Sequence, residues 1–324
     1  MKKLLYGLLI LTVSVCRRDT LFAQTDSTYI GSLTHKNFLQ LYGGRFTRQI
    51  NFTPSDNEGK QHQITLSPNS SAFCGFILGY KKITLYGDIA IPQTAKLNRQ
   101  QTNVRAYSFF ISHFKDKWGL TGFFSYNKGL LMFEENTAMM YGSRNDLRKM
   151  TAGVHIYNIL NSSRFSYIAA NSQQMQQRKS AGSFIVVLTP SYRIIQSPQS
   201  IIPIEKSKYH LTGDITMSRK LQFFSLQLKP GYAHNFVWKN GDYFFAPSFY
   251  TGPGVDLHRL SQTNSDINGI NMNFGYRAKL TTGINKSRIY GTVELLYDHT
   301  QSSIYKSVYK NAYSECTVNI GWRF

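Results

Sequence analysis

The sequence predicts an all-β fold, an antiparallel transmembrane β-barrel of about 12 strands, with about 10 to 14 strands compatible with the pattern. Three observations lead to this fold class. Apolar and polar residues alternate in many segments of about ten residues. Aromatic residues make up 14% of the 324 residues, including 21 Tyr and 22 Phe. The longest apolar run, Leu4–Cys16, has 13 residues, whereas a spanning helix needs about 18 to 20. A helical membrane protein is therefore excluded.

The first 23 residues have the pattern of an export signal. Met1–Lys3 is a positive n-region, Leu4–Cys16 is an apolar h-region, and Ala23 offers the small residue that precedes a cleavage site. Two alternatives stay open: acylation of Cys16, as in a lipoprotein, and an uncleaved buried segment. The expected division is a cleaved signal peptide over 1–23, a periplasmic N-terminal segment over 24–35 and a β-barrel domain over 36–324.

The chain is strongly basic, with 37 Lys and Arg against 17 Asp and Glu and a formal charge of +20. Cleavage after Ala23 removes four basic residues and one acidic residue, which leaves a net charge of +17. Such a charge often indicates nucleic-acid binding. Export argues against that partner, and the sequence has no zinc spacing or recognition-helix pattern. The charge instead indicates contact with an anionic lipid surface, or simply solvated loops.

The C-terminus carries the clearest strand pattern. Its apolar residues are Cys316, Val318, Ile320, Trp322 and Phe324, and the residues between them are polar or small. Because successive side chains of a strand point to opposite faces, one face of this segment is apolar and the other polar. The same alternation appears in five further segments, 72–80, 83–91, 223–236, 270–284 and 287–299.

Seven more segments are candidate strands: 36–48, 103–115, 118–130, 148–159, 163–171, 181–193 and 243–258. Short turns at 81–82, 115–117, 161–163, 239–241 and 285–287 alternate with longer polar loops at 50–62, 92–102, 131–147, 194–220, 259–269 and 300–311. This alternation of turn lengths is typical of outer-membrane barrels. Composition does not change along the mature chain, so we expect one domain.

Barrel and sandwich are the two folds that the alternation allows. In lipid every backbone N–H and C=O must be paired, and only a helix or a closed barrel achieves that. Tyr and Phe near strand ends suit the two membrane interfaces. A soluble exported β-sandwich also alternates, but its apolar face would be richer in Val, Ile and Leu. The aromatic content therefore favours the barrel, placed in the bacterial outer membrane.

The number of strands leaves one choice open. Single-chain bacterial barrels have an even number of strands, whereas 13 candidate segments are found. Either 36–48 lies outside the wall, or 208–216 hides a further strand. The distance between the two cysteines of the mature chain depends on this choice. Cys74 and Cys316 each share the apolar face of their segment, so both should face lipid. If 36–48 lies outside the wall, they come within cross-strand reach; otherwise a whole strand separates them.

Several stretches resemble a known family. The C-terminal Trp322-Arg323-Phe324 is similar to the terminal strand that bacterial outer-membrane barrels present to their assembly machinery. Four stretches resemble an uncharacterised Bacteroidota family of predicted outer-membrane barrels, which is known only as a domain of unknown function. These stretches are 64–69, 165–170, 177–184 and the Gly231-Tyr232 region. The resemblance implies the fold, the outer-membrane location and the barrel assembly machinery as a partner. It implies no functional residue.

Charged residues on the inward faces are the candidate site. They are Asp88, Arg105, Lys229, Arg277, Lys279, Glu294, Asp298, Glu315 and Arg323. A barrel of about 12 strands is narrow, and its lumen is largely filled by side chains. Opposite charges inside it should pair, because an isolated charge is costly to desolvate. Three interpretations stay open: a salt-bridge network that fills the lumen, a filter or gate for a small anion or polar solute, and an acid–base pair.

A catalytic site is not expected. A barrel lipid hydrolase would need a serine activated by a histidine. His113 follows Ser112 directly, and neighbours in a strand point to opposite faces. His155 has no serine spaced to meet it, and His299 precedes Ser302 in a loop-like stretch. The two cysteines of the mature chain do not have the spacing of a zinc site, and no cofactor or metal motif is found.

Two functions of different classes therefore remain. The first is a narrow transport or binding barrel with a charged, largely filled lumen. The second is a structural or interaction barrel whose basic loops contact lipopolysaccharide or a protein partner. A barrel lipid hydrolase is a weaker third alternative.

Overall fold

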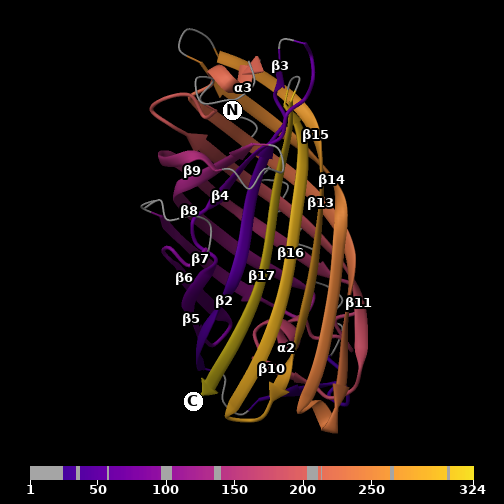
Figure 1. The fold of residues 1–324 in the computed structure, drawn as a ribbon. Coiled ribbons are helices and arrows are strands. Elements are labelled where there is room, and N and C mark those ends of the chain that lie inside the picture. Colours follow the sequence, from indigo (N-terminus) through magenta and orange to yellow (C-terminus); the bar gives the residue numbers. More distant parts are fainter. Residues whose placement is uncertain are drawn as a thin grey trace.

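The computed structural model describes residues 25–33, 37–56, 58–95, 104–134, 140–202, 211–212, 214–262, 266–304 and 307–324. The predicted signal peptide, with Ala23, lies outside the described residues. In the described chain the wall consists of long antiparallel strands that form a tall, tilted barrel (Figure 1). Their bounds are β2 (Phe38–Phe52), β5 (Ala72–Tyr80), β6 (Ile83–Ile91), β7 (Arg105–Phe114), β8 (Trp118–Glu134), β9 (Met140–Ile159), β11 (Ala181–Gln196), β13 (Lys220–Trp238), β14 (Tyr243–Ser261), β15 (Asp266–Asn285), β16 (Ile289–Ile304) and β17 (Ser307–Arg323).

These 12 strands close on themselves, as the alternation predicted. Each pairs with the next along the chain, and β17 returns to β2. The closing ladder runs from Tyr309 opposite Phe52 to Arg323 opposite Phe38. Closure leaves no unpaired sheet edge among the described wall strands, which is what a strand-built protein needs in lipid.

One end of the barrel carries the short connections 81–82, 115–117, 239–242 and 286–288, together with the C-terminus. We call it the turn end and the opposite end the loop end. At the loop end, β4 (Ile64–Pro68) pairs with both β2 and β8. It passes above β5, β6 and β7, which have only 9, 9 and 10 residues. One strand there takes the place of three, so the wall narrows toward the loop end.

The thirteenth candidate strand is a helix. Residues 163–171 form turns and the short α2 (Tyr167–Asn171), whose N-cap Ser166 accepts a hydrogen bond from the Ala169 amide at 3.2 Å. The predicted number of strands is therefore confirmed. Of the two alternatives left open, the exclusion of 36–48 is wrong, because β2 lies in the wall. Residues 208–216 are only partly described; their described part forms β12 (Leu211–Thr212), which pairs with β3 (Ser55–Asp56), and α3 (Asp214–Met217).

Three predicted loops are largely strand. Segments 131–147, 259–269 and 300–311 contain the ends of β8, β9, β14, β15, β16 and β17. Beyond the apolar outer band these ends carry buried apolar residues on the inner face, such as Leu147, Leu260 and Ile304, and mostly polar residues on the outer face. The lipid-facing alternation therefore ends while the ladder persists. The predicted turn 161–163 is, in contrast, part of a long connection over 161–180 that contains α2 and β10 (Met175–Gln177).

Cys74 and Cys316 are free and exposed on the outer face. Strand β2 separates them, because Gly43 lies opposite Cys74 and Arg45 lies opposite Cys316. Of the two arrangements that the sequence left open, the one in which a whole strand separates the two sulfurs is therefore the one found. Their outward orientation follows the sequence pattern.

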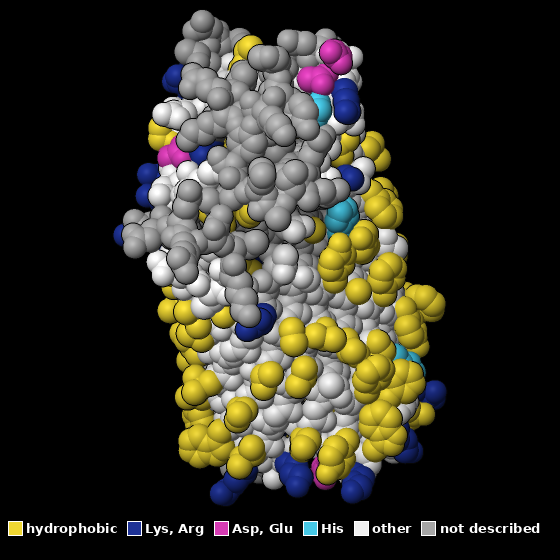
Figure 2. Space-filling model, in the orientation of Figure 1, with side chains coloured by type: hydrophobic (Ala, Val, Ile, Leu, Met, Phe, Trp, Pro, Cys, Tyr) yellow, Lys and Arg dark blue, Asp and Glu magenta, His cyan; other side chains and the backbone are white. Residues whose placement is uncertain are grey.

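The two faces of the wall differ as a membrane barrel requires. Outward apolar side chains remain exposed, for example Ile270 at 71%, Ile320 at 67% and Leu41 at 64%. Figure 2 shows hydrophobic side chains over the lower part of the visible wall and Lys and Arg along its lower edge. Within the described residues, no helix is long and apolar enough to cross a membrane.

Candidate functional site

The lumen is closed at the turn end by residues 161–180, which we call the turn-end plug. Its β10 pairs with β1 (Ile30–Ser32), and α2 and β10 lie within the lower part of the barrel (Figure 1). Tyr167 packs between two inward rings of the wall, with centroids 5.1 Å from Phe114 and 5.1 Å from Tyr157. The side chain of Asn235 donates to the Ser166 carbonyl at 2.9 Å. Aromatic packing and wall-to-plug hydrogen bonds therefore seat this segment inside the barrel.

Arg323 belongs to this closure. Its guanidinium donates to the Gln173 carbonyl of the plug at 3.1 Å from Nε, to the Asn285 side chain and to the Lys286 carbonyl. It also stacks 4.3 Å from the centroid of the Tyr290 ring. Arg323 is 1% exposed. It was expected to join a network of opposite charges, but in the described chain its hydrogen-bond partners are carbonyl and amide oxygens. It fastens the last strand to the plug.

The loop end is filled by an apolar core. Side chains from nearly the whole circumference meet there and are at most 3% exposed: Ile50, Phe52, Ile64, Leu66, Leu130, Met132, Leu147, Ile195, Leu221, Phe223, Leu260, Ile304 and Tyr309. Ile201, Ile202 and Ile215 of the connection between β11 and β13 join them. The lumen is therefore closed at both ends, and its polar residues lie between two packed layers.

Two ion pairs lie between these closures, on β15 and β16. The Arg277 Nε donates to Asp298 Oδ2 at 2.5 Å, and the Lys279 Nζ lies 2.9 Å from Glu294 Oε2. Arg277 also lies 3.4 Å from the Nε2 of His155, whose Nδ1 is 2.9 Å from the Thr189 hydroxyl. The sequence placed these four charges on facing inward sets, and the structure brings them together.

Lys229 faces the same group from β13. It is 4% exposed, and the Asp298 carboxylate is the negative charge that acts on it. Lys229 and Asp298 are too far apart to form an ion pair. Within the described residues, Asp298 is paired only with Arg277. Asp298 thus acts on two cations, one bonded to it and one without direct contact.

Asp88 and Glu315 form a second acidic group. Asp88 accepts from the Tyr42 hydroxyl at 3.5 Å, and Glu315 accepts from the Thr317 hydroxyl at 2.5 Å and from the Tyr313 hydroxyl. Both carboxylates act electrostatically on Arg48. Neither forms an ion pair within the part of the chain that the structure describes.

Arg105 does not join the lumen, and its predicted inward position is wrong. It is exposed and shares the outer face of β7 with Tyr107, Phe109 and Ile111, whereas Ser108 and Ser112 are buried on the inner face. Arg105 is the first residue of β7 and pairs with Lys128 of β8, just below the level of β4. A long cationic side chain on the outer face can extend along the wall toward the polar headgroup region. An outward Arg105 is therefore compatible with a membrane barrel.

The inward cations that were not predicted include three on different strands. They are Arg48 on β2, Lys149 on β9 and Arg193 on β11. The parity of each strand could have found them: Arg48 is two residues from the inward Phe46, and Arg193 is two residues from the inward Ile195. Below them, Gln40 donates to Asn319 at 2.8 Å and accepts from the Tyr290 hydroxyl at 2.9 Å. Polar groups thus line the lumen between the turn-end plug and the apolar core of the loop end.

The histidines weighed as catalytic residues do not contact serine hydroxyls in the described structure. His113 Nδ1 lies 3.2 Å from the Lys82 carbonyl, whereas Ser112 is buried on the inner face against Thr121 at 3.0 Å. His155 contacts Thr189, and His299 stacks on Tyr276 with centroids 5.0 Å apart. Among the residues described, His, Cys, Asp and Glu do not gather in groups of three that could hold a metal ion.

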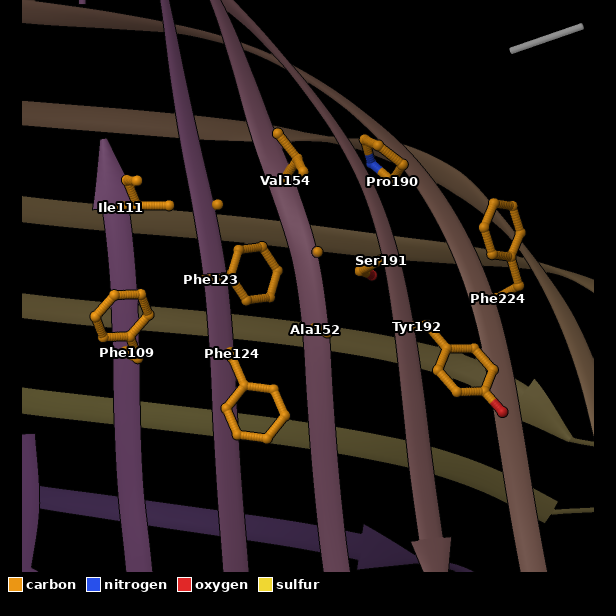
Figure 3. Close-up of a pocket in the computed structure, with 12 residues that line it drawn as sticks. Phe109, Ile111, Phe123, Phe124, Ala152, Val154, Pro190, Ser191, Tyr192 and Phe224 are labelled. Atoms are coloured by element: carbon orange, nitrogen blue, oxygen red, sulfur yellow. The ribbon is translucent and has the colours of Figure 1, made fainter. Parts of the chain in front are cut away.

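A hollow of about 480 Å³ lies on the outside of the wall, over β7, β8, β9, β11 and β13. Large apolar side chains such as Phe109, Val154 and Phe224 line it (Figure 3). The small residues Gly122 and Ala152 also line it. The β9–β11 ladder skips Thr189 and Pro190 at this place, since proline has no N–H to donate. The hollow belongs to the lipid-facing surface.

A closed antiparallel barrel with an apolar outer face and a polar, charged interior defines a transmembrane β-barrel protein, and its fold is that of bacterial outer-membrane barrels. The chain belongs to the family described as a domain of unknown function (DUF4421), whose model matches residues 24–324.

Solved structures with this general fold share little sequence with the chain. The outer-membrane protease OmpT from Escherichia coli is 9% identical, with 92% of this chain and 100% of that chain covered and a TM-score of 0.41. The Pseudomonas putida toluene transporter TodX is 7% identical, with 89% and 90% covered and a TM-score of 0.28. Ail, the attachment invasion locus protein of Yersinia pestis, crystallised with a heparin analogue, is 8% identical, with 89% and 99% covered and a TM-score of 0.21. A search of the curated proteins finds no match.

Proposed function

We propose that this protein is an outer-membrane barrel that binds a small polar or anionic solute in a narrow, charged lumen and passes it on when a closure moves. The layer of ion pairs, Arg277 with Asp298 and Lys279 with Glu294, supports this function. Replacing buried ion pairs by apolar residues is often neutral or stabilising. A barrel that needed only a filled interior would therefore not require this layer, and charged groups in a lumen are the usual means of selecting a solute.

The same proposal places the barrel in the outer membrane with its turn end toward the periplasm, because short turns are periplasmic in such barrels. The turn-end plug then closes the periplasmic mouth. The exposed rings of Trp322 and Phe324, with centroids 5.7 Å apart, lie on the outer face of the last strand. They are available to the barrel assembly machinery during insertion and to outer-membrane lipid afterwards.

The second candidate is a structural or interaction barrel that contacts lipopolysaccharide or a protein partner through its basic loops. The packed layers at both ends of the lumen favour it, because they leave the resting barrel closed. A lipid hydrolase is a weaker third candidate, and assays for cleavage of phospholipid or lipid A address it.

Planar bilayers separate the first two candidates. The purified wild-type barrel should give rare, small conductance steps, and Tyr167→Ala should give larger or more frequent ones because the plug loses its packing against Phe114 and Tyr157. Tyr243→Ala is the matched control, since Tyr243 lies on the outer face with 37% exposure. Silence of all three proteins, with each shown to be folded by its gel shift on boiling, would favour the interaction barrel.

A further inference from the structure

Three cations from different strands converge on consecutive inward residues of β17. The Arg193 Nη1 donates to the Tyr309 hydroxyl at 3.1 Å, and the Lys149 Nζ donates to the Asn311 side chain at 2.5 Å. The Arg48 guanidinium lies 4.9 Å from the centroid of the Tyr313 ring. Tyr309, Asn311 and Tyr313 carry no negative charge. We call Arg48, Lys149 and Arg193 the cation trio.

The trio lacks a bonded counter-charge. Within the described residues none of its members forms an ion pair. Arg193 is 8% exposed, and its Nε is buried without a hydrogen-bond partner. The charges that act on Lys149 are those of Arg193 and Arg48, both positive. Asp88 and Glu315 act on Arg48 from a distance, and Glu315 is already bonded to Tyr313 and Thr317.

This arrangement contrasts with the ion pairs of β15 and β16, where each cation contacts its own carboxylate. Like charges held together away from water repel each other and lose hydration, and both effects destabilise the folded barrel. Neutral side chains at these positions would fill the same space without that cost. The trio is therefore explained better by a ligand than by packing.

We propose that the cation trio binds an oxyanion, namely the phosphate or sulfate group of a solute. Guanidinium groups match the oxygen geometry of such anions with paired N–H donors, and an ammonium adds a compact charge. The side chains of Asn127 and Ser108 lie 3.1 and 3.5 Å from the Arg48 guanidinium and fix its direction. This site rests on the proposed binding function and specifies its ligand class.

Anion-dependent stability tests the site without requiring transport. The full-length barrel, purified in detergent, is heated in phosphate or sulfate and in chloride at constant ionic strength, and its unfolding temperature is followed by loss of strand signal in circular dichroism. The wild type should gain stability in phosphate and sulfate, with a saturable dependence on concentration. Chloride should give no such saturation.

Lys149→Met is the decisive variant. In chloride its unfolding temperature should equal or exceed that of the wild type, because the change removes a like charge and leaves no carboxylate unpaired. Its saturable response to phosphate should be lost. Lys149→Arg should keep the response, and Lys310→Gln is the matched control, since Lys310 precedes Asn311 on the opposite face of β17. Arg193→Gln serves as a second variant and should also lose the response.

An equal response of wild type and Lys149→Met would overturn the proposal, because phosphate and sulfate stabilise many proteins by exclusion from their surface. Lower stability of Lys149→Met in chloride would also count against it and would assign Lys149 a structural bond to Asn311. If phosphate and sulfate do not bind to the cation trio, the outcome of the conductance experiment in planar bilayers is not affected. Conductance without phosphate binding would reject the oxyanion while the transport function stands.

Discussion

Arg277 and Asp298 occupy directly opposed positions on β15 and β16, and their side chains are bonded at 2.5 Å inside the lumen. Cross-strand neighbours on one face are close enough for such a bond without any rearrangement of the backbone. The charge of the same carboxylate also acts on the buried Lys229 of β13. Asp298 therefore neutralises more than one cation, and its loss should lower the free energy of unfolding more than the loss of a single surface ion pair.

Asp298→Asn should destabilise the barrel by about 3 kcal/mol, because removing one partner of a desolvated pair leaves the other charge uncompensated. The measurement is the urea midpoint of unfolding in detergent. The double variant Arg277→Met with Asp298→Leu should recover only the part of the loss that comes from Arg277, because Lys229 keeps its charge and loses the nearby carboxylate. Arg259→Gln is the control; it breaks the pair of Arg259 with Asp266, which are 55% and 37% exposed, and should cost less than about 1 kcal/mol. Equal losses from both pairs would contradict this ranking.

The sequence alone could predict the wall but not everything in it. Strict alternation in segments such as 270–284 and 312–324 fixes which side chains face lipid, because the period of a strand is two. It fails at 163–171, where Phe165, Tyr167 and Ala169 also alternate although all three are buried as part of the plug. A short alternating stretch does not distinguish a lipid-facing strand from a buried plug segment.

The candidate site was predictable in the same measure. The four charges of β15 and β16 follow from parity on neighbouring strands, so Arg277, Lys279, Glu294 and Asp298 could be named together. Arg105 could not be placed correctly, because the expected face was misassigned near the strand end. The convergence of Arg48, Lys149 and Arg193 on β17 depends on which strands face each other across the lumen. The closure of the barrel and the tilt of its strands determine which strands face each other, and the pattern of one segment predicts neither of them.

Phe324→Asp should impair assembly more than a charge placed elsewhere on the same lipid-facing surface. The terminal ring is 51% exposed and stacks beside Trp322 at the end of the closing strand. Ile289→Asp is the matched control, because Ile289 is 63% exposed and lies opposite Trp322 on β16. The measurement is the amount of heat-modifiable barrel in the outer membrane. If both variants lower the amount of folded barrel equally, the effect of Phe324→Asp is explained by the cost of placing a charge in lipid and not by a role of the terminal residue in assembly.

Arg323→Met should loosen the turn-end plug without opening the wall. The change leaves acceptor oxygens of Gln173, Lys286 and Asn285 without their donor, at about 1 to 3 kcal/mol for a buried unsatisfied group. Hydrogen exchange should become faster at the amides that pair β1 with β10 and unchanged along the β11–β13 ladder. Arg288→Met, at an exposed position in the neighbouring turn, should leave both unchanged. Faster exchange throughout the barrel would instead mark Arg323 as part of the wall's general stability.

The place of β2 in the wall predicts which cysteines can be cross-linked. The wild-type thiols of Cys74 and Cys316 should not join under oxidation, because a whole strand lies between them. Arg45→Cys should form a disulfide with Cys316, its direct partner, since facing Cβ atoms lie about 4.5 to 5.5 Å apart. It should join Cys74 much less, because Arg45 lies opposite Ala72 and Cys74 is its diagonal neighbour. Mass spectrometry of the oxidised peptides decides between the pairs. A 74–316 peptide in the wild type would place β2 outside the wall, and a dominant 45–74 peptide would shift its register by two residues.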